Sequence, residues 1–248
     1  MKLKDKKLKK NKNIPFVGLH AHSVAGSPFD ALGYPPDHME FAYDNGMNAL
    51  ALTDHGNMNG LAWQVLHAKK MQKQGKEFKP IFGCEAYFIP SVKKWKKSYE
   101  DIKAQSKKKS DYEASSSGTT VEDEAASKKK IKSVLNRRRH LILLAMNPTG
   151  LQNIFKMISS SYTGDNFYRY PRVDYDMLEK HSEGVIAASA CLGGIYAGNY
   201  WENRDTGPDA ILSAMRGTTQ KMQAIFGNRW YGELQWNNIP EQHELNQY

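Results

Sequence analysis

The sequence predicts an α/β fold built on a parallel β-sheet, and three observations support this prediction. Short apolar runs alternate along the chain with longer segments of helical periodicity. The runs are apolar on both faces, as expected of strands that helices cover on each side. Residues that can bind metal follow several of the runs, where the active sites of β/α barrels are found. The alternation leaves open whether the sheet stays open or closes into a barrel.

The apolar runs that we expect to form strands are short and rich in residues that favour strands. They cover residues 14–19, 49–53, 80–89, 140–145, 185–189 and 230–235. The helices between them are expected at residues 36–46, 61–74, 149–162, 174–181 and 208–226. Pro36 suits the first turn of a helix, and Gly46, Gly75 and Gly227 suit the positions where helices end.

Two segments have the composition of loops. Residues 23–36 are rich in Gly and Pro, and residues 164–172 are rich in Tyr and Arg. The second loop either packs against the mouth of the expected barrel or stacks on nucleic acid.

The net charge of +9 is unevenly distributed along the chain. Residues 1–13 carry a net charge of +6 and residues 93–139 a net charge of +8, so the remainder is acidic, at −5. We therefore expect one domain at residues 14–248, preceded by a basic disordered tail at residues 1–13. A mobile insertion rich in Lys, Ser and Glu is expected to interrupt it at residues 93–138. The lysine runs either keep these segments solvated or contact phosphates without sequence specificity.

The two cysteines, Cys84 and Cys191, lie far apart in the sequence, which argues against a disulfide framework and favours a reducing compartment. No apolar stretch approaches the about 20 residues that span a bilayer. No secretory signal follows the charged N-terminus either. We therefore expect a cytoplasmic protein without a membrane partner.

Two short motifs carry most of the functional signal. His20 and His22 follow the first expected strand, and His55 follows the second. Because side chains alternate along a strand, His20 and His22 point to the same side. Imidazoles and a carboxylate such as that of Glu85 can converge on metal ions, and paired metals commonly serve phosphoester hydrolysis. The candidate residues at strand ends, or in the loops just beyond, are His20, His22, Asp30, His55, Glu85, His140 and Cys191.

Three acidic or thiol side chains also have simpler explanations. Cys191 is equally explained as an ordinary buried cysteine, and Asp30 as a residue that caps a turn. Asp54 adjoins His55 and is expected to orient a neighbouring group rather than to bind metal itself.

Six blocks of the chain occur in the same order as in a known domain family. They are FVGLHAHS, NGMNALALTDHGNMNG, FKPIFGCEAYFIP, RHLILLAMNPTGLQNIFKMIS, SEGVIAASACLGG and YGELQ…IPEQHELN. Together they resemble the PHP (polymerase and histidinol phosphatase) domain, in particular the copy that opens bacterial DNA polymerase III alpha subunits. The resemblance covers about residues 14–92 and 139–248.

The resemblance implies a distorted seven-stranded β/α barrel that holds two or three divalent metal ions. The family's metal ligands correspond here to His20, His22, Asp30, His55, Glu85, His140 and Cys191. Of these, His20, His22, His55 and Glu85 are also expected to carry catalysis. Nitrogen and oxygen ligands with one thiolate suit Zn²⁺, with Mn²⁺ or Fe as alternatives. The family's later Asp-x-His motif would follow Tyr248, so we expect the barrel to be incomplete at the C-terminus.

The resemblance further implies a metal-dependent phosphoesterase domain of a DNA-directed DNA polymerase that serves DNA replication. The substrate would be a DNA 3′ end, removed in 3′–5′ exonuclease proofreading, or pyrophosphate. DNA, reached through the rest of the polymerase, and other replication subunits would be the partners, and the sequence does not indicate an oligomeric state. Two alternatives stay open: a stand-alone phosphatase of the histidinol-phosphate type, and a non-catalytic scaffold that metal stabilises. The polymerase palm is not among these residues, so the chain itself is not expected to polymerise DNA.

Overall fold

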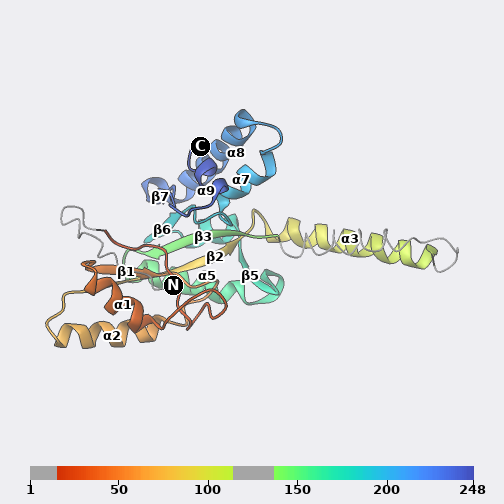
Figure 1. The fold of residues 1–248 in the computed structure, drawn as a ribbon. Helices are drawn as coiled ribbons and strands as arrows, with labels where there is room; N and C mark the ends of the chain where they lie inside the picture. The colour runs from red at the N-terminus through yellow and green to blue at the C-terminus, as the bar shows by residue number, and fades with distance from the viewer. Residues whose placement is uncertain (1–15, 114–136) are drawn as a thin grey trace, which may run out of the picture.

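A mixed β-sheet forms the centre of the computed structural model, which describes residues 16–113 and 137–248 (Figure 1). The strands lie in the order β4-β5-β2-β3-β6-β7, and β1 also pairs with β2. Their bounds are Ala49–Leu52 (β1), Lys79–Phe88 (β2), Arg139–Ala145 (β3), Phe167–Tyr168 (β4), Tyr170–Val173 (β5), Val185–Ala188 (β6) and Trp230–Tyr231 (β7). Strand β2 therefore lies at the junction of β1, β3 and β5.

The prediction of a parallel sheet is wrong, because β3 runs antiparallel to both of its neighbours, β2 and β6. The pairs β1–β2, β2–β5 and β6–β7 are parallel. An apolar run such as Leu141–Leu144 is buried whichever way it points, so its composition does not encode its direction. Among the described residues, no pairing joins the end strands β4 and β7 to close the sheet.

The first expected strand, at residues 14–19, is reduced in the described part of the chain to a single parallel bridge between Gly18 and Leu50. A Cβ atom on Gly18 would lie only 2.8 Å from the Leu50 side chain. A glycine thus lets this segment approach β1 closely.

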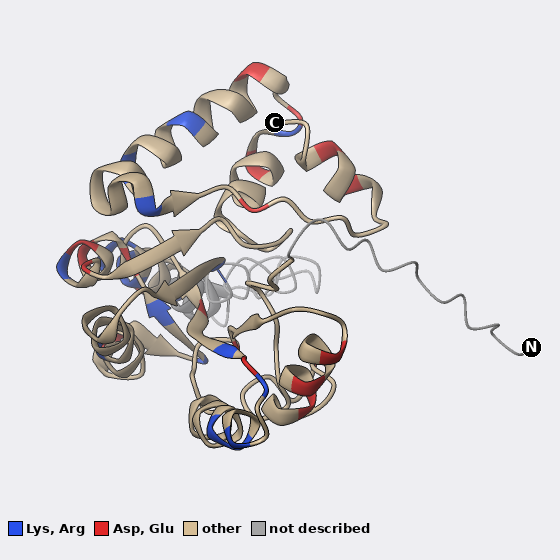
Figure 2. Ribbon diagram, turned by 90° about the vertical axis from the view of Figure 1, so that its left-hand side faces the viewer, with Lys and Arg blue, Asp and Glu red and all other residues tan. Residues whose placement is uncertain are grey.

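Helices pack around the sheet in groups. They are α1 (Pro35–Asp44), α2 (Leu61–Lys73), α3 (Val92–Glu113), α5 (Pro148–Ser161), α6 (Tyr175–His181), α7 (Ile195–Asn203), α8 (Pro208–Phe226) and α9 (Pro240–Leu245). Helices α1 and α2 lie at one end of the molecule, and α7, α8 and α9 at the other (Figure 1). The predicted helices lie within a few residues of their expected bounds, whereas α7 and α9 were not expected. Figure 2 shows that charged residues lie mostly on the helices, with few in the sheet.

The central strands β1 and β3 are buried on both faces over most of their length, as their composition predicts. Leu141 and Leu143 of β3 pack into a cluster with Ile154 and Met157 of α5. The alternate residue Ile142 belongs to a second cluster on the other side. Both cysteines are free, as expected.

The first part of the expected insertion forms helix α3, which its composition did not predict. Helix α3 extends away from the body (Figure 1), and its first turns are anchored where Val92 and Trp95 pack with Ile89. The guanidinium of Arg172 lies 4.1 Å from the Trp95 ring. The helical spacing of these apolar residues is obscured by the lysines between them. The remainder of the insertion and the N-terminal tail lie outside the described residues.

The expected loop at residues 164–172 contains the short hairpin of β4 and β5 instead. Arg169 forms its turn with a positive φ of 60°, a conformation that few residues other than glycine adopt. None of the described helices has the length and apolar character needed to cross a membrane.

Candidate metal centre

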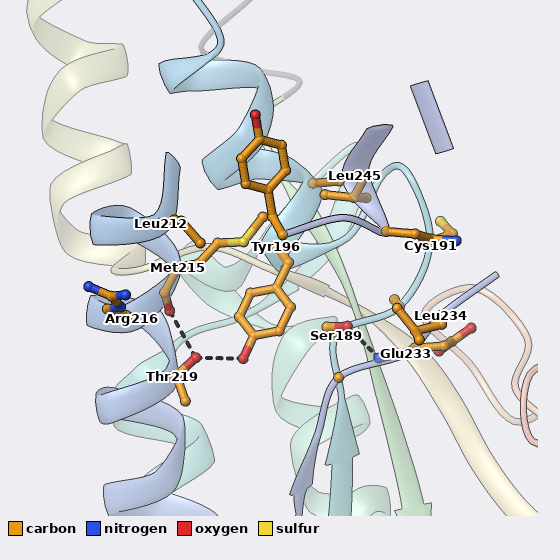
Figure 3. A pocket seen from close by; sticks show the side chains of 15 residues that line it. Ser189, Cys191, Tyr196, Leu212, Met215, Arg216, Thr219, Glu233, Leu234 and Leu245 are labelled. Atoms are coloured by element: carbon orange, nitrogen blue, oxygen red, sulfur yellow. Dashed lines mark hydrogen bonds between the residues drawn. The ribbon is translucent and has the colours of Figure 1, made fainter. Parts of the chain in front are cut away.

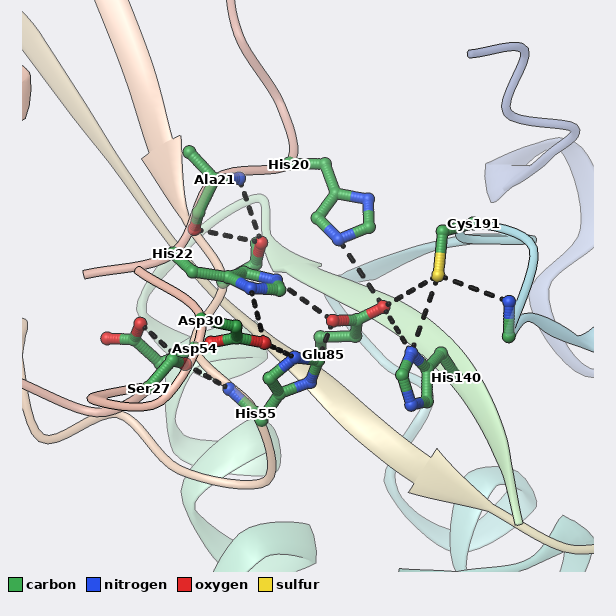
Figure 4. Close-up of polar contacts among 12 residues, drawn as sticks. His20, Ala21, His22, Ser27, Asp30, Asp54, His55, Glu85, His140 and Cys191 are labelled. Atoms are coloured by element: carbon green, nitrogen blue, oxygen red, sulfur yellow. Dashed lines mark hydrogen bonds and ion pairs between the residues drawn. The ribbon is translucent and has the colours of Figure 1, made fainter. Parts of the chain in front are cut away.

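The carboxylate of Glu85, in the middle of β2, is fully buried and is surrounded by four imidazoles (Figure 4). Its Oε1 lies 2.9 Å from Nδ1 of His140 and 3.3 Å from Nε2 of His20. Its Oε2 lies 2.9 Å from Nε2 of His22 and 2.9 Å from Nδ1 of His55. One buried negative charge is thus shared among four histidines.

Backbone hydrogen bonds bring the first two histidines to this position. Ala51 of β1 donates its N–H to the carbonyl of Gly18 at 2.8 Å, and Thr53 donates to the carbonyl of Ala21 at 2.7 Å. The segment that carries His20 and His22 is therefore held along β1.

The other two histidines come from opposite strand ends. His55 follows β1 and forms a parallel bridge with Glu85. His140 lies at the amino end of β3, whereas candidate ligands that follow a strand, such as His55, lie beyond a carboxyl end. Because β3 is antiparallel to β2, its amino end lies beside the carboxyl end of β2, where His140 is paired with Tyr87.

Asp30 completes one side of the cluster. Its Oδ2 lies 2.7 Å from Nε2 of His55 and 3.7 Å from Nδ1 of His22. Its side chain is 49% exposed, so it lies at the solvent side of the cluster.

Asp54 does not face the cluster but holds the loop that carries Asp30. It accepts hydrogen bonds from the N–H and hydroxyl of Ser23, at 2.6 and 2.8 Å, and from the hydroxyl of Ser27 at 3.0 Å. These contacts agree with the expectation that Asp54 orients its neighbours.

Cys191 lies at the edge of the cluster beside His140. Its Sγ is 3.4 Å from Nδ1 of His140 and 3.7 Å from Oε1 of Glu85, and it accepts the N–H of Gly193 at 3.3 Å. The structure thus brings all seven candidate residues of the sequence analysis into one cluster.

Two further polar residues at this cluster, Glu233 and Gln235, were not among the candidates expected from the sequence. Glu233 Oε1 lies 2.7 Å from Nδ1 of His20, and Gln235 lies beside both of them. Both residues follow β7. The sequence placed them inside a strand expected at residues 230–235, so the search for ligands after strands did not single them out.

Burial and acidic neighbours act in opposite directions on the protonation of the cluster. Burial alone would lower the pKa of His20, but its contacts with Glu233 and Glu85 outweigh this and raise the pKa to about 10. The pKa of His55 is raised in the same way, against its burial, by Glu85 and Asp30. Burial would raise the pKa of Glu85, yet the four surrounding imidazoles lower it well below its usual range. The site therefore stabilises positive charge, which either protons or bound cations can supply.

The thiol of Cys191 behaves differently. Burial, followed by the nearby charge of Glu85, raises its pKa to about 12. A thiolate here needs a cation beside it, as metal coordination provides.

The donor atoms fit bound metal ions. Nε2 of His22, Nδ1 of His55 and Oε2 of Glu85 are buried and lack the geometry of a hydrogen bond, although each nitrogen lies 2.9 Å from that oxygen. Buried polar atoms without a hydrogen bond are rare, so they call for an explanation such as an ion. Three sets of donor atoms lie within 4.8 Å of one another, namely His20–His22–Glu85, His22–Asp30–His55 and His55–Glu85–His140. Imidazole and carboxylate donors suit Zn²⁺, Mn²⁺ or Fe.

A cavity of about 540 Å³ adjoins the cluster, between β6, α7, α8 and the C-terminal residues (Figure 3). Cys191 and Glu233 line one side of it, and its wall is otherwise largely apolar. The hydroxyls of Tyr196 and Thr219 bond each other at 2.6 Å, so they are satisfied within the wall.

The fold and the cluster together define a mixed α/β domain with a histidine-rich candidate metal site. The chain belongs to the PHP domain family, whose sequence profile matches residues 18–237.

Curated relatives place the chain more narrowly. It is 33% identical to the DNA polymerase III subunit alpha of Borreliella burgdorferi over 94% of this chain, and 32% identical to that of Aquifex aeolicus over 93%. In both cases the match covers 16% of the relative, so the chain spans about one sixth of the length of these proteins. The chain is thus a PHP domain homologous to the N-terminal region of DNA polymerase III alpha subunits.

A solved structure of a candidate metal-dependent phosphoesterase from Bifidobacterium adolescentis is 14% identical, with a TM-score of 0.39. The alignment covers 92% of this chain and 80% of that one. A likeness this slight carries no inference about function.

Proposed function

We propose that the cluster around Glu85 binds two or three divalent metal ions and hydrolyses phosphoesters. The observation that carries this proposal is the fully buried carboxylate with four imidazole nitrogens within 3.3 Å. Divalent metals supply neutralisation of phosphate oxygens and activation of water for hydrolysis. Zn²⁺ is the first candidate, and Mn²⁺ or Fe the alternatives.

The position of each residue in the cluster suggests its role. The ligands proposed to hold the metals are His20, His22, Asp30, His55, Glu85, His140 and Cys191. Glu85, being central and buried, supplies the negative charge that offsets the metal charge. Asp30 is half exposed, so an incoming phosphoester would meet Asp30 and the nearby His22 and His55 first. These positions favour His20, His22, His55 and Glu85 as the residues on which catalysis depends.

The polymerase relatives suggest the biological setting. We propose that the domain serves DNA replication within a longer alpha subunit in the cytoplasm, with DNA and other replication subunits as partners. The substrate proposed is a DNA 3′ end or pyrophosphate. The polymerase palm would lie in other parts of such a subunit.

The test combines metal analysis with hydrolysis assays on protein purified without chelators. Metal content is measured for the parent chain and for His22→Ala and Glu85→Gln, with His181→Ala at the end of α6 as a histidine control. Each protein is then assayed on bis(p-nitrophenyl) phosphate, on a 3′-labelled single-stranded oligonucleotide and on pyrophosphate. We expect metal and hydrolysis in the parent and the control, and a loss of both in the two cluster variants.

Two other outcomes would contradict this proposal. Equal metal content in all four proteins would rule out the cluster as the metal site. Bound metal without hydrolysis of any of the three substrates would indicate a scaffold that metal stabilises.

A further inference from the structure

Glu233 connects the residues after β7 to the first histidine of the cluster. Its Oε1 lies 2.7 Å from Nδ1 of His20, and the side chain of Glu233 is 18% exposed. On the other side of the ring, Nε2 of His20 faces Oε1 of Glu85 at 3.3 Å. The His20 imidazole is therefore held between two carboxylates, one on each nitrogen.

The Glu233 carboxylate is itself fixed by its surroundings. Its backbone N–H donates to the hydroxyl of Ser189 at 2.8 Å, which ties the segment after β7 to the end of β6. The amide of Gln235 donates to Oε1 of Glu233 at 2.7 Å, and Asn237 donates to the oxygen of Gln235 at 3.1 Å. The amide groups of Gln235 and Asn237 thus hold the Glu233 carboxylate where it contacts His20.

The chemistry of imidazole gives this contact a function. A neutral histidine carries one proton, and only the other nitrogen offers a lone pair to a metal. A carboxylate that accepts the proton on Nδ1 leaves Nε2 of His20 free to bind and makes it more basic. We propose that Glu233 is a positioning residue that fixes the tautomer and ring orientation of His20 for metal binding. The inference rests on the proposed metal site and adds a residue that lies outside the seven candidate ligands.

Zinc affinity is the first measurement. Competition with a chelating dye gives the Zn²⁺ dissociation constants of the parent chain, Glu233→Ala, Glu233→Gln and the control Glu244→Gln, whose carboxylate accepts from Tyr200. Loss of such an outer hydrogen bond typically weakens metal affinity about 10- to 100-fold. We expect this loss for Glu233→Ala, a smaller loss for Glu233→Gln, which can still accept from Nδ1, and none for the control.

The second measurement separates positioning from general stability. In nitrogen-15 NMR spectra of the zinc-loaded parent, the His20 proton should reside on Nδ1. Its signal should disappear or exchange rapidly in Glu233→Ala while the histidine signals of His55 persist. If Glu233→Ala does not fold, the nearly isosteric Glu233→Gln provides both readouts.

The experiments distinguish failure of the proposed role of Glu233 from failure of the proposed metal site. Zinc affinities of both Glu233 variants within twofold of the parent, or an unchanged Nδ1 proton, would overturn the role of Glu233 and leave the metal site standing. Absence of zinc binding in the parent chain would overturn the proposed function and this inference together.

Discussion

The carboxylate of Asp54 holds Ser23 by two hydrogen bonds, accepting the backbone N–H at 2.6 Å and the hydroxyl at 2.8 Å. Asp54 follows β1, and Ser23 directly follows His22. This pairing fixes the point at which the histidine segment turns away from the sheet into the loop that carries Asp30. The shape of the cluster thus depends on a carboxylate that faces away from it.

Replacing Asp54 with alanine should weaken both the fold and the cluster. The buried donors of Ser23 and Ser27 would lose their acceptor, at about 1–3 kcal/mol for each group left unpaired. We expect a lower denaturation midpoint and a reduced metal content for Asp54→Ala. The exposed residue Asp44, at the end of α1, gives the control Asp44→Ala, which should change neither quantity.

Removal of metal should lower the thermal stability of the parent chain. A ligand at 100 times its dissociation constant adds about 2.7 kcal/mol, and a protein of this size shifts by about 2–4 °C per kcal/mol. Dialysis against a chelator should therefore lower the Tm measured by calorimetry by about 5–10 °C. The same treatment should leave the Tm of Glu85→Gln unchanged. A Tm of the parent that does not respond to the chelator would contradict this prediction.

Gly150 allows α5 to approach the turn before β6. A Cβ atom at this position would collide with the carbonyl group of Gly184, which itself has a positive φ of 68°. Gly150→Ala should therefore destabilise the fold by about 2 kcal/mol or more, because backbone has to move. Gly217 in α8 has nothing within 4 Å of its Cβ position. Gly217→Ala should stabilise by about 0.5–1 kcal/mol, and chemical denaturation compares the two.

Arg172 ties the root of α3 to the β4–β5 hairpin. It is fully buried, lies over Trp95, and donates to the carbonyls of Tyr168 at 2.8 Å and Tyr170 at 3.1 Å. Arg172→Met should cost about 1–3 kcal/mol for each carbonyl left unpaired. Arg169→Gly in the same hairpin should be neutral or stabilising, since it relieves a positive φ. Equal stabilities of the two variants would show that Arg172 is not the anchor.

The sequence was sufficient to place the candidate cluster because its residues follow or begin strongly apolar strands. His20, His22 and His55 lie in two short motifs that follow apolar runs, and Glu85 lies within the apolar run of β2. Glu233 was missed because it lies inside the strand expected at residues 230–235, whereas β7 ends at Tyr231.

Neither the antiparallel direction of β3 nor the helical structure of α3 could be predicted from the sequence, and the two reasons differ. Strand direction depends on which connections the chain makes, and the apolar residues of β3 are buried in either orientation. The anchoring residues Val92 and Trp95 lie within a stretch whose lysines dominate its composition and obscure the helical spacing of its apolar residues. In both places tertiary packing decided the outcome.

The contact between His20 and Glu233 joins residues 213 positions apart. During synthesis the first histidines leave the ribosome long before Glu233 has been translated, so a nascent chain holds an unfinished pocket. Contacts of such separation in sequence form late, because closing a long loop is entropically costly. Maturation of the pocket is therefore expected to be among the last events in folding, after the sheet between these two residues has assembled.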